Sequence, residues 1–130
     1  MRQDVKSNYA LVEGLAAQSR TAAAYNTANA DMSAGRSASF LISAGTFGAS
    51  ATLAAKLQHS ADGSTDWTDE VAGAGNDTAI TTLTAAGHAQ LNVVNPRRRF
   101  YRVATTVAVA AVVFSVTTAH GPLNSVSANP

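Results

Sequence analysis

The sequence contains no cysteine among its 130 residues. Disulfides, thiol nucleophiles and thiolate metal sites are therefore all excluded. Charged residues are also scarce: they make up 13% of the chain, about half of the roughly 25% in an average globular protein, and the formal net charge is +1. Because proteins that bind nucleic acid through its phosphates normally carry a cationic excess, this balance argues mildly against that class of function.

The few charges are unevenly distributed along the chain. No Asp, Glu, Lys or Arg follows Arg102, and Asp77 is the only one between Val71 and Pro96. Soluble monomers usually keep charges scattered over their surface. We therefore expect that part of the surface is covered by a partner or by other copies of the chain.

Long apolar runs are missing as well. The first 20 residues carry Asp4, Lys6 and Glu13 where an export signal would need an uninterrupted apolar segment. The most apolar stretch, Val107 to Val116, is about half of the roughly 20 residues that a membrane-spanning helix requires. We expect neither an export signal nor a membrane helix, and we assign this stretch to a core strand.

A repeated strand pattern is what the sequence does contain. Leu53, Ala55 and Leu57 alternate with Ala54, Lys56 and Gln58, which is the two-residue period of a strand with one buried face. Although alanine is abundant, no long segment keeps the apolar spacing of an amphipathic helix. Turns rich in Gly, Pro, Asn and Asp separate the apolar runs at regular intervals. Strands are therefore expected near residues 22–30, 37–44, 51–59, 66–71, 78–84, 89–95, 98–107 and 111–119.

This spacing predicts one all-β domain, an antiparallel two-sheet β-sandwich or a barrel of jelly-roll or immunoglobulin-like type. We favour the jelly-roll-like β-sandwich and assign it to residues 21–120. Residues 1–20 do not fit the strand rhythm, and we interpret them as an extended N-terminal arm rather than a short helical turn. Residues 121–130 are polar and predict a C-terminal tail.

Signals for catalysis or metal binding are weak. His59, His88 and His120 are far apart in sequence, and none has a carboxylate or a second histidine at metal-ligand spacing. No serine lies in a GxSxG motif or beside another nucleophile signature. We expect no enzymatic activity, no metal and no cofactor.

The acidic segment "DGSTDWTDE", residues 62–70, surrounds the single tryptophan. It does not fit an EF-hand calcium loop, because Gly63 follows directly after the first aspartate. We expect a hairpin turn at Asp62 and Gly63, followed by a strand that buries Trp67. The alternative is a carbohydrate site in which Trp67 and Tyr101 are stacking platforms.

The segment "NPRRRFYRV", residues 95–103, concentrates the arginines. Pro96 cannot donate a ladder hydrogen bond, so we expect it to mark the start of a strand. Side chains would then alternate between two faces, with Arg98 and Arg102 outward if Tyr101 is inward. The arginines therefore do not form a single cationic stripe for a phosphate backbone.

A guanidinium on such a strand can clamp a carboxylate or stack on an aromatic ring. For the outward Arg98 and Arg102 we first expect pairing with the chain's own acids, for example Asp66 or Asp69. A protein partner comes second and nucleic acid last. The candidate partner-binding residues are Arg97, Arg98, Arg99, Arg102, Arg20, Tyr9 and Leu11.

Several of these segments occur together in a familiar order. An "ADM" segment precedes an apolar strand, "LQHSADGSTDW" follows, and "PRRRFYRV" comes next. In this ordered set, over residues 18–119, the chain resembles small structural proteins of tailed bacteriophages that are encoded with the head genes. The positions that carry the resemblance are Asp31, Met32, Gln58, Ser60, Asp62, Gly63, Trp67, Pro96, Arg99, Tyr101 and Arg102.

The resemblance implies a β-sandwich in the virion, a decoration (cement) protein on the capsid surface that is assembled in the host cytoplasm. It implies the major capsid protein as partner and a homo-oligomer, with a trimer favoured, and no membrane. Sparse charge and an arm suit this role, because shell-binding proteins gain affinity from many copies and from large neutral contacts. The alternatives are a component of the head-to-tail junction or tail, and a carbohydrate-binding β-sandwich that attaches to the host surface.

Overall fold

The computed structural model describes residues 10–33, 35–73 and 75–123 of the chain. Within these ranges the protein is all-β and contains no helix. The strands found there are β1 (Ala10–Arg20), β2 (Ala23–Asn26), β3 (Ala30–Asp31), β4 (Gly35–Phe47), β5 (Thr52–Ser60), β6 (Thr68–Asp69), β7 (Gly87–Val93), β8 (Phe100–Ala108) and β9 (Val112–Leu123).

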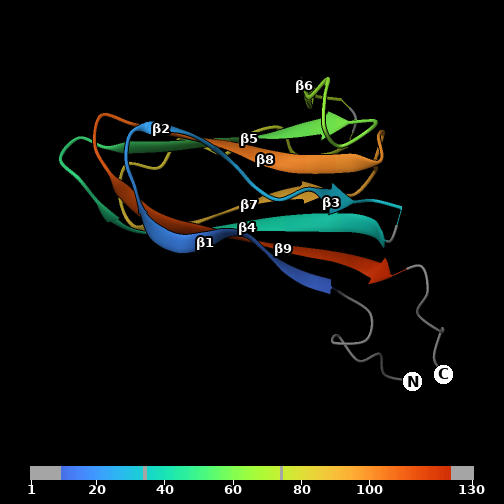
Figure 1. Ribbon diagram of the computed structural model, residues 1–130, viewed down its shortest axis with the longest axis horizontal. Coiled ribbons are helices and arrows are strands. Elements are labelled where there is room, and N and C mark those ends of the chain that lie inside the picture. The colour runs from blue at the N-terminus through green and yellow to red at the C-terminus, as the bar shows by residue number, and fades with distance from the viewer. Residues whose placement is uncertain (1–9, 34, 74, 124–130) are drawn as a thin grey trace.

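The strands form two antiparallel sheets. The four-stranded sheet has the order β1-β9-β4-β7, and the five-stranded sheet has the order β2-β8-β5-β6 with β3 also paired to β8. Figure 1 shows the two sheets as two layers, with β4 and β9 in one layer and β5 and β8 in the other. The pairing is nested, because β1 pairs with β9, β2 with β8, β4 with β7 and β5 with β6.

Both sheets contribute to one hydrophobic core. On β5 and β8, and over most of β4 and β9, every second residue is buried, as the two-residue period requires. On β4, for example, Phe40 and Ile42 are buried while Leu41 between them is exposed. The largest fully buried side chains are Tyr101, Phe40, Phe114, Ile42, Leu53, Leu57, Leu91, Val93, Val103, Val107, Val112 and Val116.

The expected strand at residues 78–84 is wrong. This segment runs along the free edge of β5, where the structure has isolated bridges between Leu53 and Leu83 and between Lys56 and Ala79. The bonds between Leu53 and Leu83 are reciprocal, with both N–H groups 2.9 Å from the facing carbonyl oxygens. The segment therefore covers the edge of β5 without building a continuous ladder.

The start of the chain differs from the expected arm. Residues 10–20 form β1, an edge strand of the four-stranded sheet that pairs with β9. Its register with β9 shifts between Glu13 and Leu15 and again between Leu15 and Gln18. Such irregularities break the two-residue alternation, which is why the sequence pattern did not indicate a strand.

The expected arm and tail lie only partly within the described residues. Residues 1–9, the remainder of the expected arm, and residues 124–130, most of the expected tail, lie outside the described residues. Strand β9 continues to Leu123, so the first residues assigned to the tail belong to the sheet. β1 begins beside His120, three residues before the end of β9, since Ala10 is in register with His120.

Candidate functional site

The arginine segment lies in a loop rather than in a strand. β8 begins at Phe100, so Arg97, Arg98 and Arg99 belong to the connection between β7 and β8. From Phe100 onward the alternation is as predicted, because Tyr101 is buried and Arg102 lies on the opposite, outer face. The predicted separation of the arginines onto two strand faces therefore applies only to the part of the segment that is inside β8.

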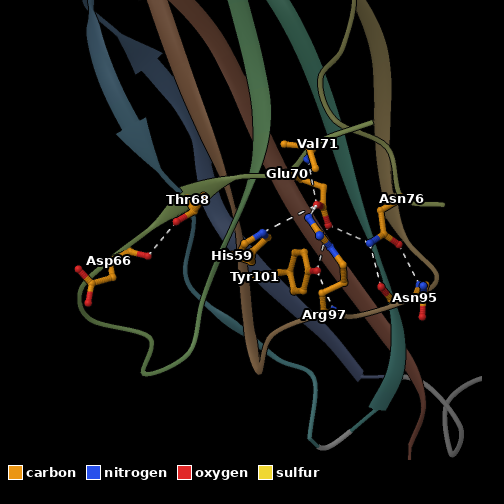
Figure 2. Close-up of polar contacts among 9 residues, drawn as sticks. All are labelled: His59, Asp66, Thr68, Glu70, Val71, Asn76, Asn95, Arg97 and Tyr101. Atoms are coloured by element: carbon orange, nitrogen blue, oxygen red, sulfur yellow. Dashed lines mark hydrogen bonds and ion pairs between the residues drawn. The ribbon is translucent and has the colours of Figure 1, made fainter. Parts of the chain in front are cut away.

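Glu70 is the centre of a buried polar cluster where β6 ends and β8 begins (Figure 2). Its side chain is fully shielded from solvent. Oε2 accepts hydrogen bonds from Asn76 Nδ2 at 2.9 Å and from the Tyr101 hydroxyl at 3.1 Å. Oε1 accepts the Val71 N–H at 2.9 Å and pairs with Nη2 of Arg97. One carboxylate thus joins strand β8, the β7–β8 loop and the segment after β6.

Asn76 extends these contacts to the end of β7. Its Oδ1 accepts the N–H groups of Val94 and Asn95 at 2.9 and 2.8 Å, and its Nδ2 donates to the Asn95 carbonyl at 2.9 Å. The Arg97 N–H donates to the Tyr101 hydroxyl at 3.0 Å. The loop that carries the arginines is therefore fixed at several points. We call this set of residues the Glu70 cluster: His59, Glu70, Asn76, Arg97 and Tyr101.

The cluster holds Glu70 in its charged form. Burial raises the pKa of this carboxyl, but the hydrogen bonds from Arg97, Asn76, the Val71 N–H and Tyr101 outweigh burial and lower the pKa to about 2. The same contact with Glu70 raises the pKa of Arg97, while burial raises the pKa of Tyr101. The cluster therefore contains an ion pair whose acid is buried and whose base is partly exposed.

His59 is the member of the cluster with an unsatisfied atom. Its Nε2 is buried without a hydrogen-bond partner, 3.8 Å from Oε1 of Glu70. Its ring packs edge-on against Tyr101, with 5.6 Å between ring centroids. Burial lowers the pKa of His59, and the negative charge of Glu70 offsets this only in part. The histidine is therefore neutral in the folded protein at neutral pH.

We expect the Glu70 cluster to make folding sensitive to acid in two pH ranges. The pKa of His59 is below its ordinary 6.5 in the folded state, so the unfolded chain takes up this proton first and stability falls as the pH drops below 6.5. The lowered pKa of Glu70 contributes stability above its ordinary 4.5, and this stability is lost as the pH falls toward about 2.

Denaturant unfolding at about pH 7.5, about pH 5.5 and about pH 3 measures both effects. In a His59→Gln variant the loss between the two higher pH values should shrink while the loss at the lowest remains. An equal loss in the variant over the upper range would contradict the role of His59.

Arg99 is bound to another acid of the same chain. Its Nε and Nη2 donate to Oδ1 and Oδ2 of Asp31 at 3.1 and 3.0 Å, and its guanidinium lies 4.9 Å from the Phe100 ring centroid. The hydrogen bond from Arg99 is the main cause that lowers the pKa of Asp31 far below its usual range. Pairing with the chain's own acids was predicted for Arg98 and Arg102, with Asp66 or Asp69 as partners, and the ion pairs of the described residues do not include it. They join Arg97 to Glu70 and Arg99 to Asp31 instead.

Arg20 does not lie on a binding surface. It is 6% exposed, and its Nη1 donates to the carbonyl oxygens of Ala16 at 2.8 Å and Phe114 at 3.2 Å. Its guanidinium packs 5.0 Å from the Phe114 ring centroid and 5.6 Å from that of Tyr25. The structure contradicts the prediction that Arg20 contacts a partner, because its donors fasten β1 to β9 inside the protein.

The two aromatic residues proposed as stacking platforms differ in exposure. Tyr101 is fully buried, so the prediction that it offers a face to a ligand is wrong. Trp67 is half-buried, and the guanidinium of Arg102 lies over its ring at 4.2 Å from the centroid. One face of the indole is therefore already occupied by a residue of the same chain.

The turn expected at Asp62 and Gly63 lies in the connection between β5 and β6, but the expected strand that buries Trp67 is wrong, because β6 begins only at Thr68 and Trp67 is half-buried. Strands β5 and β6 pair on either side of the turn, and Gly63 has a φ of 77°, which favours glycine. Asp62 Oδ1 accepts the N–H groups of Ser64 and Thr65 at 3.0 and 2.9 Å. The hydrogen bonds from Thr65 and Ser64 lower the pKa of Asp62 far below its usual range. This aspartate therefore stabilises a turn.

A surface with almost no charge covers the outer side of the four-stranded sheet. Its residues alternate with the buried ones on β4, β9 and β7. In register, Leu41 lies between Gln90 of β7 and Thr117 of β9. We define this neutral face as Ser39, Leu41, Ser43, Gly45, His88, Gln90, Asn92, Val113, Ser115, Thr117 and Ala119. None of these residues is Asp, Glu, Lys or Arg.

The neutral face has a hollow and a defined border. The hollow, ≈ 470 Å³, lies between β4 and β7 against Leu41 and His88. Two acids mark the border: Glu13 of β1, in register with Thr117, and Asp77, whose Oδ2 accepts Asn92 Nδ2 at 3.1 Å. Leu11, a predicted partner-binding residue, also lies on β1 and is 70% exposed. Tyr9, another predicted partner-binding residue, is outside the described residues.

The described residues include no group of three or more His, Asp or Glu side chains placed to hold a metal ion. Nor do they include a helix long and apolar enough to cross a membrane. Comparison of the chain with protein-family models, with curated proteins and with solved structures finds no match to any of them.

Proposed function

We propose that the chain is a non-enzymatic virion structural protein, a capsid decoration protein that binds the major capsid protein and stabilises the head. The observation that carries the proposal is the neutral face, a broad outer sheet surface without an acidic or basic residue. Docking such a face onto a protein shell removes few charged groups from water, because Glu13 and Asp77 lie only at its border, so the desolvation cost is small. Its apolar hollow beside Leu41 offers a place for a side chain of the shell.

The proposal includes a jelly-roll fold. We infer a jelly-roll β-sandwich. In this fold the first strands pair with the last ones and inner strands pair within them, and the paired strands are divided between two sheets. The orders β1-β9-β4-β7 and β2-β8-β5-β6 support this inference. So does the single core to which both sheets contribute. Jelly rolls recur in viral capsid and lectin domains, so this fold suits a shell protein but does not by itself identify one.

The proposal includes self-association and an N-terminal arm. Residues 1–9 precede the edge strand β1 and would reach a neighbouring molecule from the border of the neutral face. A trimer is favoured, and a solution mass three times the chain's 13.3 kDa would support it. The protein would then be located on the capsid surface of the virion after assembly in the host cytoplasm.

Introducing a charge on the neutral face tests the proposal. We expect Ser43→Lys to weaken binding to shells of the major capsid protein by about tenfold or more, because the new ammonium loses water at the contact. The matched control is Thr81→Lys, since Thr81 is also exposed but lies in the segment 78–84 beside β5, outside the neutral face. Co-sedimentation with empty shells measures both variants.

Three outcomes would overturn the capsid assignment. Equal weakening by both lysine variants would mean that the neutral face is not the contact. Binding restricted to one vertex of the particle would favour the head-to-tail junction or the tail. Absence of binding by the unmodified chain, together with saturable binding of a sugar, would favour the carbohydrate-binding alternative.

A further inference from the structure

Arg102 is held in a fixed position without an acidic partner. Its guanidinium lies over the Trp67 ring, 4.2 Å from the centroid, and its Nε donates to Gln58 Oε1 at 3.0 Å. The ion pairs found in the described part of the chain join other residues and do not include Arg102. Arg97 and Arg99, by contrast, are neutralised by Glu70 and Asp31. The charge of Arg102 is therefore uncompensated.

The acids on strands of the five-stranded sheet are already occupied, Asp31 by Arg99 and Asp69 by two other residues. Asp69 of β6 accepts Gln58 Nε2 at 2.8 Å and Lys56 Nζ at 3.1 Å. Gln58 thus donates to Asp69 with its nitrogen and accepts from Arg102 with its oxygen. This chain of contacts orients the guanidinium from one side while Trp67 supports its plane from another.

Two donor groups of Arg102 remain free for a ligand. The buried side-chain atoms without a partner in the described part of the chain are His59 Nε2 and Thr118 Oγ1. Both Nη atoms of Arg102 therefore reach solvent. The Nη groups of an arginine form a planar fork that matches the two oxygens of a carboxylate. Because the side chain is already immobilised by Trp67 and Gln58, little further entropy is lost on binding.

We propose that Arg102, supported by Trp67 and Gln58, is a binding site for a single carboxylate from an acidic side chain of a protein partner. The proposal deepens the function proposed above and rests on it, since it adds a second contact on the opposite sheet from the neutral face. Asp66 and Asp69 flank Trp67 in sequence, so a phosphate chain would meet two negative charges there. A single carboxylate carries one charge, so it meets less repulsion there than a chain of phosphates.

The isolated chain tests the site directly, because Trp67 is its single tryptophan. Titration with acetate, at an ionic strength held constant with chloride, should change the Trp67 fluorescence and reach half-saturation below about 0.1 M. The change should be lost in Arg102→Lys, which keeps the charge but not the fork. It should persist in Arg99→Lys, whose arginine is already bound to Asp31.

The proposal would be overturned if acetate did not change the Trp67 fluorescence, or if chloride alone changed it equally. It would also be overturned if a short oligonucleotide gave a larger change, or if Arg102→Lys kept the response. The source of the carboxylate follows from two further measurements on the same variants. A lower solution mass of Arg102→Lys than of Arg99→Lys assigns the carboxylate to a second copy. Shell binding weakened about tenfold at unchanged mass assigns it to the capsid protein. If neither changes, the site receives no protein partner and the proposal fails.

The carboxylate site at Arg102 and the capsid assignment fail on different results. Failure of the unmodified chain to bind shells would overturn the capsid assignment while the acetate titration still decides on Arg102. Full shell binding by Arg102→Lys at unchanged mass would overturn the carboxylate site while the capsid assignment stands.

Discussion

Replacing Glu70 by glutamine should lower the free energy of unfolding by about 3 kcal/mol, because the amide leaves several buried donors without an acceptor. Glu70 accepts from Asn76, Tyr101, the Val71 N–H and Arg97, and its side chain is fully buried. A glutamine of the same shape keeps one carbonyl oxygen but directs its NH₂ group at donors, of which only the Tyr101 hydroxyl can also accept a hydrogen bond. The β7–β8 loop should lose its attachment to the core as a result.

The control for this substitution is one residue away. Asp69→Asn makes the same chemical change, but Asp69 is about half exposed and pairs with an exposed Lys56. Surface pairs of this kind contribute about 0–1 kcal/mol, so we expect a small effect. Urea unfolding at neutral pH, followed by far-UV circular dichroism, compares the two variants. Equal losses of stability would show that burial of Glu70 has no special importance.

Arg20→Met is expected to destabilise the protein by about 2 kcal/mol, because charge-assisted hydrogen bonds to two carbonyl oxygens disappear while the packing volume is kept. Those carbonyls belong to Ala16 on β1 and Phe114 on β9. The methionine retains contact with the Phe114 ring but not the attraction of a cation for it. β1 should therefore separate from the sheet more readily than the remaining strands.

Hydrogen exchange of the β1 amides reports this local separation, and urea unfolding reports the global effect. The control is Arg98→Met, because Arg98 is an exposed loop residue that forms none of the ion pairs found in the described part of the chain. It should change stability by less than about 0.5 kcal/mol. Similar protection of the β1 amides in Arg20→Met and the unmodified protein would contradict the fastening role of Arg20.

The all-β class and the two antiparallel sheets could be predicted because alternation is a local property. Leu53, Ala55 and Leu57 on β5 lie on one face whatever the rest of the chain does, and the structure buries all three. The segment 78–84 shows the limit of this reasoning. Its alternation resembles a strand, but β5 offers it only isolated points of contact.

The polar cluster and the fixed arginines could not be predicted, because their partners are distant in sequence. Glu70 meets Arg97 and Tyr101 only after β8 has been placed beside β5. The residues around Arg20 in the sequence are uncharged, and nothing in them indicates that its partner is a backbone carbonyl of β9. A sequence pattern locates a strand and its faces, whereas an ion pair depends on which strands become neighbours.

The nested strand order determines when the protein can fold. β9 lies between β1 and β4, and β8 lies between β2 and β5, so the last two strands of the chain complete both sheets. A growing chain on the ribosome therefore presents unpaired strand edges until residues 100–123 have emerged. We expect both sheets to be completed only after synthesis of these strands, and slowly, because the pairs that close the sheets join distant parts of the chain. A polypeptide released before synthesis of residues 100–123 would lack β8 and β9 and leave strand edges unpaired in both sheets. Such chains are prone to aggregate.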